Sequence, residues 1–207
     1  MKTVIVANTK GGVGRTTLSI HMAVAAASDP QKLIGVLDLD KSRNATEWIE
    51  SRHKQLPTLI HFNEEISDSL ARSSAAYLDI VFIDTPSNGG RSMEPIEVIL
   101  PNADLIIVPI RPSPNDLRAL GAFLPLLHSC GRPFLFVVNC AHHGATITQD
   151  MVLTLAELGP VSPIVLGSRG EFLPRFDGLT VLETAPDSRA AREIGALWNL
   201  VKTELAA

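Results

Sequence analysis

Residues 10–17, Lys-Gly-Gly-Val-Gly-Arg-Thr-Thr, constrain the fold more than any other stretch of the chain. The apolar run before them, 3–8, is typical of a β-strand, and the Ala-rich segment after them, 18–27, is typical of a helix. Glycines let backbone N–H groups approach an anion closely, and the helix N-terminus behind them adds about half a positive charge. The sequence therefore predicts a phosphate-binding loop, in which Thr16 supplies a hydroxyl to Mg²⁺.

The loop departs from the pattern G-x-x-x-x-G-K-[ST] at two positions, because Thr9 replaces a glycine and Arg15 replaces a lysine. Instead, Lys10 stands directly before the double glycine. K-G-G-x-G-x-T-T resembles the deviant Walker A loop of the ParA/MinD family of dimeric ATPases. The resemblance implies that Lys10 reaches across a dimer to the partner's nucleotide. The alternative is a glycine-rich turn with a solvated lysine.

The rest of the chain alternates apolar runs with helical segments. The runs are rich in Val, Ile and Leu without alternation, which is typical of strands buried on both faces. We therefore expect a single α/β domain over 1–207, with a mostly parallel twisted sheet flanked by helices, as in P-loop NTPases. The expected strands are 3–8, 33–38, 58–62, 80–84, 105–109, 134–140 and 161–166, and the expected helices are 18–27, 44–54, 64–76, 115–129, 147–158 and 188–205.

Composition narrows the class of protein. The 207 residues are 45% hydrophobic, enough for one domain with a sizeable core. A net charge of −4 argues against a constitutively basic nucleic-acid binder and leaves a local basic patch open. Cys130 and Cys140 lack metal-ligand spacing, so we expect buried free thiols in a reducing cytosol. The first strand occupies the N-terminus and no apolar segment spans a bilayer, so we expect a cytoplasmic protein.

Two carboxylate motifs follow predicted strands. Asp84 ends a run of four apolar residues and resembles Walker B, so we expect it to hold Mg²⁺; an ordinary aspartate in the Asp-Thr-Pro turn is the alternative. Asp38-Leu39-Asp40 resembles the first switch of the family. The resemblance implies that Asp40 orients the attacking water and joins the metal site, and that Asp38 supports the metal shell and the loop.

Two further motifs lie near later strand ends. Residues 109–117 resemble the family's P-x-x-P-S-P-x-D-L segment, which implies a place at the dimer interface; a structural turn is the alternative. Asn139 ends another run, and the resemblance implies that its amide contacts adenine, with 166–169 in the same pocket. The alternative for Asn139 is a buried amide that satisfies loop backbone.

These motifs define the candidate site. The expected catalytic residues are Lys10, Arg15 and Asp40, and the expected Mg²⁺ residues are Thr16, Asp40 and Asp84. The residues expected to bind ATP or ADP are Lys10, Gly11, Gly12, Val13, Gly14, Arg15, Thr16, Thr17, Asp38 and Asn139.

The resemblance continues through 178–181 and 190–197 and covers essentially the whole chain; it is closest to short ParA proteins without an N-terminal DNA-binding domain. It implies a DNA-partition ATPase, which segregates a plasmid or a chromosome. ATP would join two chains into a homodimer or a polymer that binds DNA non-specifically on the nucleoid, and a ParB-like or small centromere-binding partner would stimulate hydrolysis. The candidate DNA contacts are Arg169, Arg175, Arg189, Arg192 and Lys202.

Other functions stay open. A protein-cargo positioning ATPase fits the same motifs, as does a slow or non-hydrolysing scaffold. A MinD-like membrane role needs a basic amphipathic C-terminal helix, whereas 194–205 carries a single lysine, so we expect this segment to pack onto the domain. A P-loop metabolic enzyme has no support from cysteine ligands.

Arg15 is the departure from the family that matters most. Arginine keeps the positive charge but is planar, bulkier and forked, so the exchange for lysine is not conservative. We predict that the chain binds nucleotide and hydrolyses it slowly or in an altered way.

Overall fold

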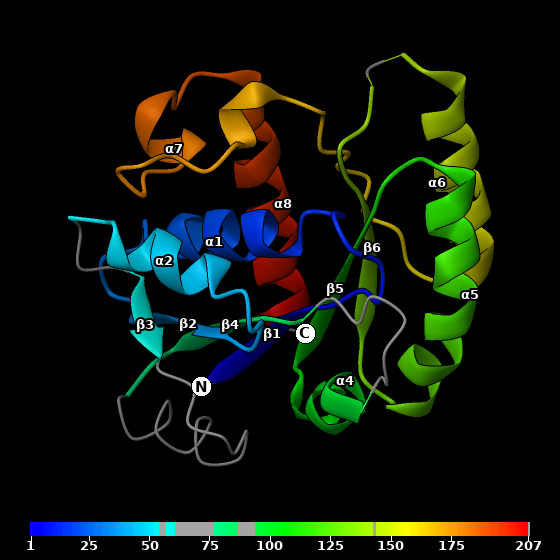
Figure 1. Cartoon of the computed structure of the whole chain (residues 1–207), viewed down its shortest axis with the longest axis horizontal. Helices are drawn as coiled ribbons and strands as arrows, with labels where there is room; N and C mark the ends of the chain where they lie inside the picture. Colours follow the sequence, from blue (N-terminus) through cyan, green and yellow to red (C-terminus); the bar gives the residue numbers. More distant parts are fainter. Residues whose placement is uncertain (54–56, 61–76, 87–93, 143, 207) are drawn as a thin grey trace.

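The computed structural model describes residues 1–53, 57–60, 77–86, 94–142 and 144–206. The described part of the chain forms a parallel sheet of six strands in the order β3-β2-β4-β1-β5-β6, with helices on both faces (Figure 1). The strands are β1 Lys2–Val6, β2 Ile34–Asp38, β3 Thr58–Ile60, β4 Ile80–Asp84, β5 Leu105–Ile110 and β6 Phe134–Val138. The helices are α1 Arg15–Ala26, α2 Asn44–Glu50, α4 Glu94–Ile99, α5 Pro114–Ser129, α6 Thr146–Leu158, α7 Val181–Thr184 and α8 Arg189–Ala206, with short 3₁₀ turns η1 Leu100–Asn102 and η2 Gly170–Phe172.

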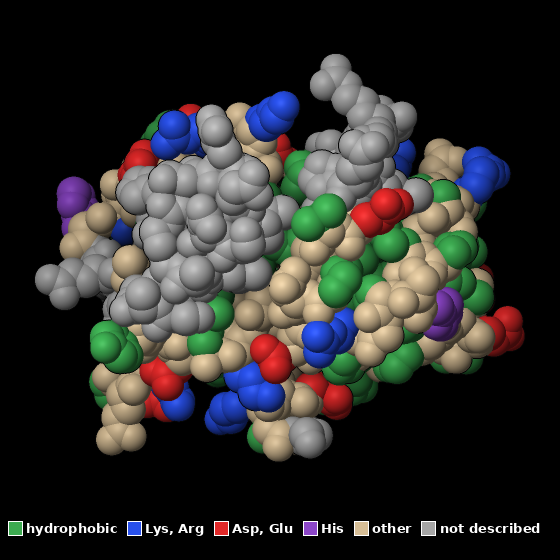
Figure 2. Space-filling model, turned by 90° about the horizontal axis from the view of Figure 1, so that it is seen from below, with side chains coloured by type: hydrophobic (Ala, Val, Ile, Leu, Met, Phe, Trp, Pro, Cys, Tyr) green, Lys and Arg blue, Asp and Glu red, His purple; other side chains and the backbone are tan. Residues whose placement is uncertain are grey.

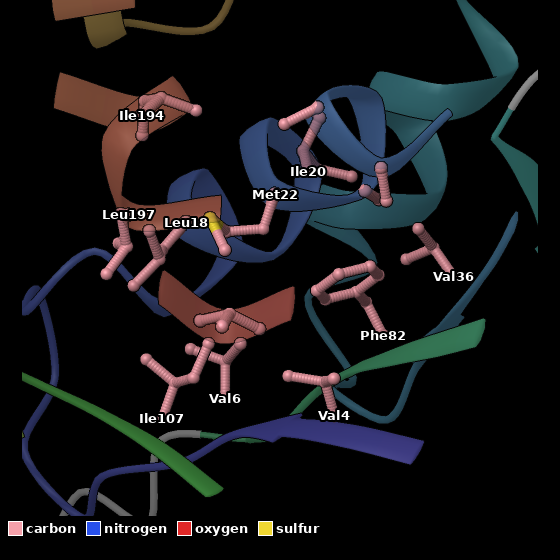
Figure 3. Close-up of a cluster of buried hydrophobic side chains, with 14 of the residues drawn as sticks. Val4, Val6, Leu18, Ile20, Met22, Val36, Phe82, Ile107, Ile194 and Leu197 are labelled. Carbon is pink, nitrogen blue, oxygen red and sulfur yellow. The ribbon is translucent and has the colours of Figure 1, made fainter. Parts of the chain in front are cut away.

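The central strands are buried on both faces, as their continuous apolar runs predicted. Alternate residues of β1 point to opposite sides: Val4 and Val6 join one core, and Ile5 joins the other. The first core is covered by α1, α2, α7 and α8, and the second by α4, α5 and α6. Figure 3 shows side chains of α1 and α8 packed onto Phe82 and Ile107 in the first core. The predicted fold class is therefore confirmed.

One predicted strand is wrong. Residues 161–166 run beside β6, but Val161 pairs with Phe136 only through an isolated bridge, and a second isolated bridge joins Gly167, just after this range, to Ala141. Pro163 has no N–H to donate, and the Ile164 N–H donates to the Ser162 hydroxyl at 3.0 Å instead of to β6. The ladder is therefore interrupted between its two ends.

Other differences concern ends and short elements. α1 begins at Arg15, three residues before the predicted start at Leu18. The turns of α4, η1, η2 and α7 were not predicted, and the predicted helix over 64–76 lies outside the described residues. Cys130 and Cys140 are free thiols, as expected, but both are partly exposed rather than buried.

The C-terminal helix packs onto the domain. This agrees with the prediction for 194–205, whose single lysine is too little positive charge for a basic membrane-binding helix. Ile194, Leu197 and Val201 of α8 are at most 1% exposed and join the core beside α1. Among the described helices, none combines the length and apolarity needed to cross a membrane.

His21 connects the helix behind the glycine loop to α7. The ring is fully buried and lies edge-on to Trp48 and Phe172. Its Nδ1 lies 2.8 Å from the Thr17 carbonyl oxygen and therefore carries the proton, and Nε2 accepts the Val181 N–H at 3.4 Å. Burial lowers the pKa of His21 to about 4.

We expect His21 to stay neutral down to a pH of about 4. Between pH 6.5 and 4 the unfolded chain binds more protons at this position than the folded chain, so His21 stabilises the fold above pH 6.5, and this contribution is lost as the pH falls. Nitrogen NMR of the imidazole across this range checks the prediction. A titration midpoint near about 6.5, as for an exposed histidine, would contradict it.

Candidate nucleotide site

The parallel sheet brings the predicted site residues to one edge. The glycine loop follows β1, Asp38 ends β2, Asp84 ends β4, and Asn139 follows β6. Asp38 and Asp84 are register partners on neighbouring strands. These residues thus lie at the carboxyl edge of the sheet, which is where ligands of wound α/β sheets bind.

The glycine loop has the backbone that an anion cradle requires. Gly12 and Gly14 have φ angles of 72° and 90°, in the left-handed region that favours glycine. Gly14 also directly precedes α1, and a Cβ there would collide with the Asn139 amide nitrogen. A side chain at position 14 would therefore be strained in its backbone conformation and would have to displace the Asn139 amide.

Thr16 and Asp84 form the centre of the site. The Thr16 hydroxyl donates to Asp84 Oδ2 at 2.6 Å, while Asp84 Oδ1 is buried without a partner among the described residues. Burial, opposed by the Thr16 hydrogen bond, raises the pKa of Asp84 to about 7. A hydroxyl beside a carboxylate with an unsatisfied oxygen is a donor set that suits Mg²⁺, which takes oxygen ligands from one or two protein groups and otherwise from phosphates and water. These residues therefore fit the ion.

Asp38 and Asp40 have different surroundings. Asp38 is buried and accepts three hydrogen bonds, from Asp40 N and Thr46 N at 2.9 Å and from the Thr46 hydroxyl at 3.0 Å. Its carboxylate thereby satisfies an N–H in the first turn of α2 and fixes the loop after β2. Asp40 is half-buried, and its Oδ1 accepts from Ser42 N at 2.9 Å. Asp38 thus has the geometry of a loop support, while Asp40 is only partly buried.

Arg15 does not project freely into the loop. Nη1 donates to the Asn8 and Lys10 carbonyls at 2.7 and 2.6 Å, and Nε donates to the Thr85 carbonyl at 3.0 Å. The side chain is buried, and desolvation lowers its pKa, against the opposing charges of Asp84 and Asp40. Nη2 makes no hydrogen bond with the described residues. Arg15 therefore links the helix end of the glycine loop to the backbone before the glycines and to Thr85, directly after β4. Its Nη2 is the amino group that is left to contact a ligand.

Lys10 is the first of the two remaining predicted residues. Its ammonium has no partner among the described residues, while its backbone N–H donates to Asn8 Oδ1 at 2.8 Å.

Asn139 is the second. Its side chain donates to the Val13 carbonyl at 2.8 Å and accepts from Cys140 N at 2.9 Å. Asn139 thus satisfies loop backbone, which was the alternative interpretation, and it also lines a pocket of about 180 Å³. That pocket is bounded by Gly14, Thr17, Asn139, Leu166, Gly167, Ser168, Arg169 and Phe172, so residues 166–169 do share it.

Two residues of the site were missed in the sequence. Asn8 ties the loop to β5, because its amide donates to the Pro109 carbonyl at 2.8 Å. Arg111, after β5, lies beside Gly12. An asparagine at the end of a strand before a glycine loop is a local sequence pattern that could have identified Asn8. Arg111 lies inside the 109–117 segment, which the resemblance assigned to the dimer interface, and no local pattern indicates that it lies beside Gly12.

Residues 1–73 match a family described as AAA domain (AAA_31). "Maintenance of carboxysome distribution protein A" of Gloeobacter kilaueensis is 31% identical, over 99% of this chain and 94% of that protein. The chain belongs to the ParA/MinD family of deviant Walker A ATPases. The protein of the same name from Halothiobacillus neapolitanus is 27% identical, over 96% of this chain and 95% of that protein.

Solved structures show the same ParA/MinD fold. The MinD cell division protein of Aquifex aeolicus superimposes with a TM-score of 0.73, at 16% identity, over 98% of each chain. A putative plasmid partition protein of Borrelia burgdorferi bound to AMPPNP gives 0.71, at 15% identity, over 98% of this chain and 99% of that one. Nucleotide hydrolysis is the activity of this ParA/MinD family, and the structural neighbours of the chain include complexes with AMPPNP, with ATP, and with ADP and magnesium.

Proposed function

We propose that the chain is an ATP-switched positioning ATPase whose cargo is a protein assembly. The observation that carries the ATPase part is the Thr16–Asp84 pair directly behind the glycine loop. Support for the cargo comes from the two curated relatives, which match nearly the whole chain and are both named for carboxysome distribution.

In this proposal the backbone N–H groups of residues 10–17 and the N-terminus of α1 hold the phosphates. Thr16 and Asp84 hold Mg²⁺, which supplies charge neutralisation at the transferring phosphoryl group. Asp40 orients the attacking water, and the free Nη2 of Arg15 contacts phosphate. The pocket beside Asn139 takes the base.

Phosphate release in the presence of Mg²⁺ tests the ATPase part. We expect slow turnover that stops when EDTA removes the ion. Absence of turnover together with tight ATP binding would instead support the non-hydrolysing scaffold.

Lys10→Ala tests the switch. Because the Lys10 ammonium has no partner within the described chain, its loss leaves the fold unchanged. We expect the ATP-dependent dimer to be lost while ADP binding changes by no more than about twofold. Light scattering after size exclusion measures the first and titration calorimetry the second. A Lys10→Ala dimer equal to that of the wild type would contradict the cross-dimer role.

DNA partition is the second candidate, and one feature favours a polyanionic partner. Arg169, Arg189 and Arg192 line a hollow of about 600 Å³ beside α6 and α8. Glu193 pairs with Arg169 at 2.7 Å and with Arg189 at 3.2 Å, and Arg175 pairs with Asp177 at 2.9 Å, which reduces the local positive charge. Figure 2 shows the molecule from below, away from this hollow, and there too the described surface carries both basic and acidic side chains. DNA binding then depends on pairing two copies of the hollow.

Gel retardation of DNA with ATP, with ADP or without nucleotide tests this hollow as a DNA-binding surface. We expect DNA to be bound only when ATP is present.

A strain in which the gene is deleted distinguishes a protein cargo from a DNA cargo. Protein bodies that lose their even spacing while plasmids are inherited normally support the proposal; plasmid loss with normal spacing supports DNA partition.

A further inference from the structure

Arg111 lies at the rim of the glycine loop. It sits in the connection between β5 and α5, and its Nη1 is 3.7 Å from the position that a Cβ on Gly12 would occupy. The side chain is 37% exposed, so part of it is accessible to solvent. A guanidinium this close to the loop lies within reach of an anion held by that loop.

The chain fixes the direction of this guanidinium. Nε donates to Asp116 Oδ1 at 2.9 Å and Nη2 to Asp116 Oδ2 at 3.2 Å, a forked pair. The Asp116 side chain is 1% exposed and also accepts from the Ser113 hydroxyl at 2.8 Å, where Ser113 is the N-cap of α5. Because Asp116 occupies Nε and Nη2, Nη1 is the one amino group without a partner among the described residues.

The position of Arg111 along the loop indicates which phosphate it faces. The pocket proposed for the base borders Gly14 and Thr17, at the helix end of the loop. Thr16, in the Mg²⁺ site, also belongs to that end. Lys10–Gly12 form the opposite end, so a nucleotide with its base in the pocket places its terminal phosphate toward Gly12 and Arg111.

The other loop arginine leaves room for such a group. Arg15 uses Nε and Nη1 on three backbone carbonyls, so it offers one amino group to the ligand. A nucleoside triphosphate carries more negative charge than the diphosphate, and the additional charge lies on its terminal phosphate. An oriented guanidinium at the rim supplies a further positive charge.

We propose that Arg111, positioned by Asp116, contacts the terminal phosphate and makes the site prefer a nucleoside triphosphate over a diphosphate. This inference rests on the proposed binding of ATP at residues 10–17. Arg111 is the contacting residue and Asp116 the positioning residue.

Dissociation constants for a non-hydrolysable ATP analogue and for ADP test the proposal. We compare wild type with Arg111→Ala, Arg111→Lys and Asp116→Asn, and use Arg118→Ala as the matched control. Arg118 is an arginine of α5 whose one bond to the described residues is to the exposed Asn115. Circular dichroism melting establishes that each variant folds.

We expect Arg111→Ala to weaken binding of the ATP analogue by about tenfold or more and ADP by no more than about twofold, since one charge-assisted contact is lost. Arg111→Lys is expected to fall between, because an ammonium cannot hold the fork to Asp116 and also reach the phosphate. Asp116→Asn is expected to reduce the preference for ATP without changing ADP affinity, and Arg118→Ala to match the wild type.

Equal weakening of ATP and ADP by Arg111→Ala, or an unchanged ratio of the two, would overturn the role of Arg111 while leaving the proposed function standing. If Asp116→Asn fails to fold, the Arg111 variants decide alone. A wild-type protein that binds neither nucleotide would overturn the proposed function itself.

Discussion

Asp84→Asn is expected to lower Mg²⁺-dependent ATP hydrolysis by about 100-fold or more, because a neutral amide replaces the charged oxygen that faces the ion. The unpartnered Oδ1 is the reason for the size of this effect, since no other described group satisfies it. Phosphate release at saturating ATP measures the change. Thr16→Val is the matched variant, because it removes the hydroxyl on the other side of the 2.6 Å contact and keeps the shape.

The raised pKa of Asp84 leads to two predictions of opposite sign. As the pH rises, the contribution of Asp84 to the free energy of unfolding falls, while the affinity for Mg²⁺ increases. The pKa of Asp84 rises from 3.8 to about 7 on folding, so between these values the folded protein holds a proton that the unfolded chain has released. The contribution of Asp84 to the free energy of unfolding is therefore largest below pH 3.8 and is lost as the pH rises toward 7.

Binding of Mg²⁺ requires the ionised form, so it strengthens as the pH rises through about 7. Titration of Mg²⁺ into the ATP-loaded protein at several pH values measures this, and the inflection is expected to vanish in Asp84→Asn. A wild-type affinity that is flat across this range would show that the carboxylate does not hold the ion.

Arg15→Ala is expected to destabilise the protein by about 3 kcal/mol or more and to weaken nucleotide binding strongly. The substitution leaves the buried Asn8 and Thr85 carbonyls, together with that of Lys10, without their donor. Chemical denaturation followed by circular dichroism gives the first quantity, and calorimetric titration with ADP gives the second.

Arg15→Lys is the informative partner of that variant. One ammonium cannot reach all three carbonyls, so we expect a loss of about 1–2 kcal/mol of stability. The guanidinium of Arg15 is held by these carbonyls, whereas a lysine ammonium at this position would not be. We therefore expect the ammonium to contact the phosphates and to raise turnover above that of the wild type. If Arg15→Lys changes neither affinity nor turnover, the prediction that Arg15 slows or alters hydrolysis is wrong.

The sequence by itself determined the central sheet and the glycine loop. Continuous apolar runs mark β1, β4, β5 and β6, because strands buried on both faces need apolar residues at successive positions. The loop over 10–17 is also encoded locally, since the left-handed angles of Gly12 and Gly14 depend on the residues themselves. The strand predicted over 161–166 was wrong because Pro163, within the apolar run, has no N–H for the ladder.

Only the tertiary structure decided what the site residues contact. Arg15 reaches the Thr85 carbonyl 70 positions away, and Asn139 reaches the Val13 carbonyl 126 positions away. Asp38 turned out to support α2 through Thr46, and Arg111 came to lie beside Gly12. Backbone carbonyls carry no signature in the sequence, and their directions follow from the crossover connections that place distant strand ends together. A side chain that bonds to them therefore acquires its role only when the sheet is assembled.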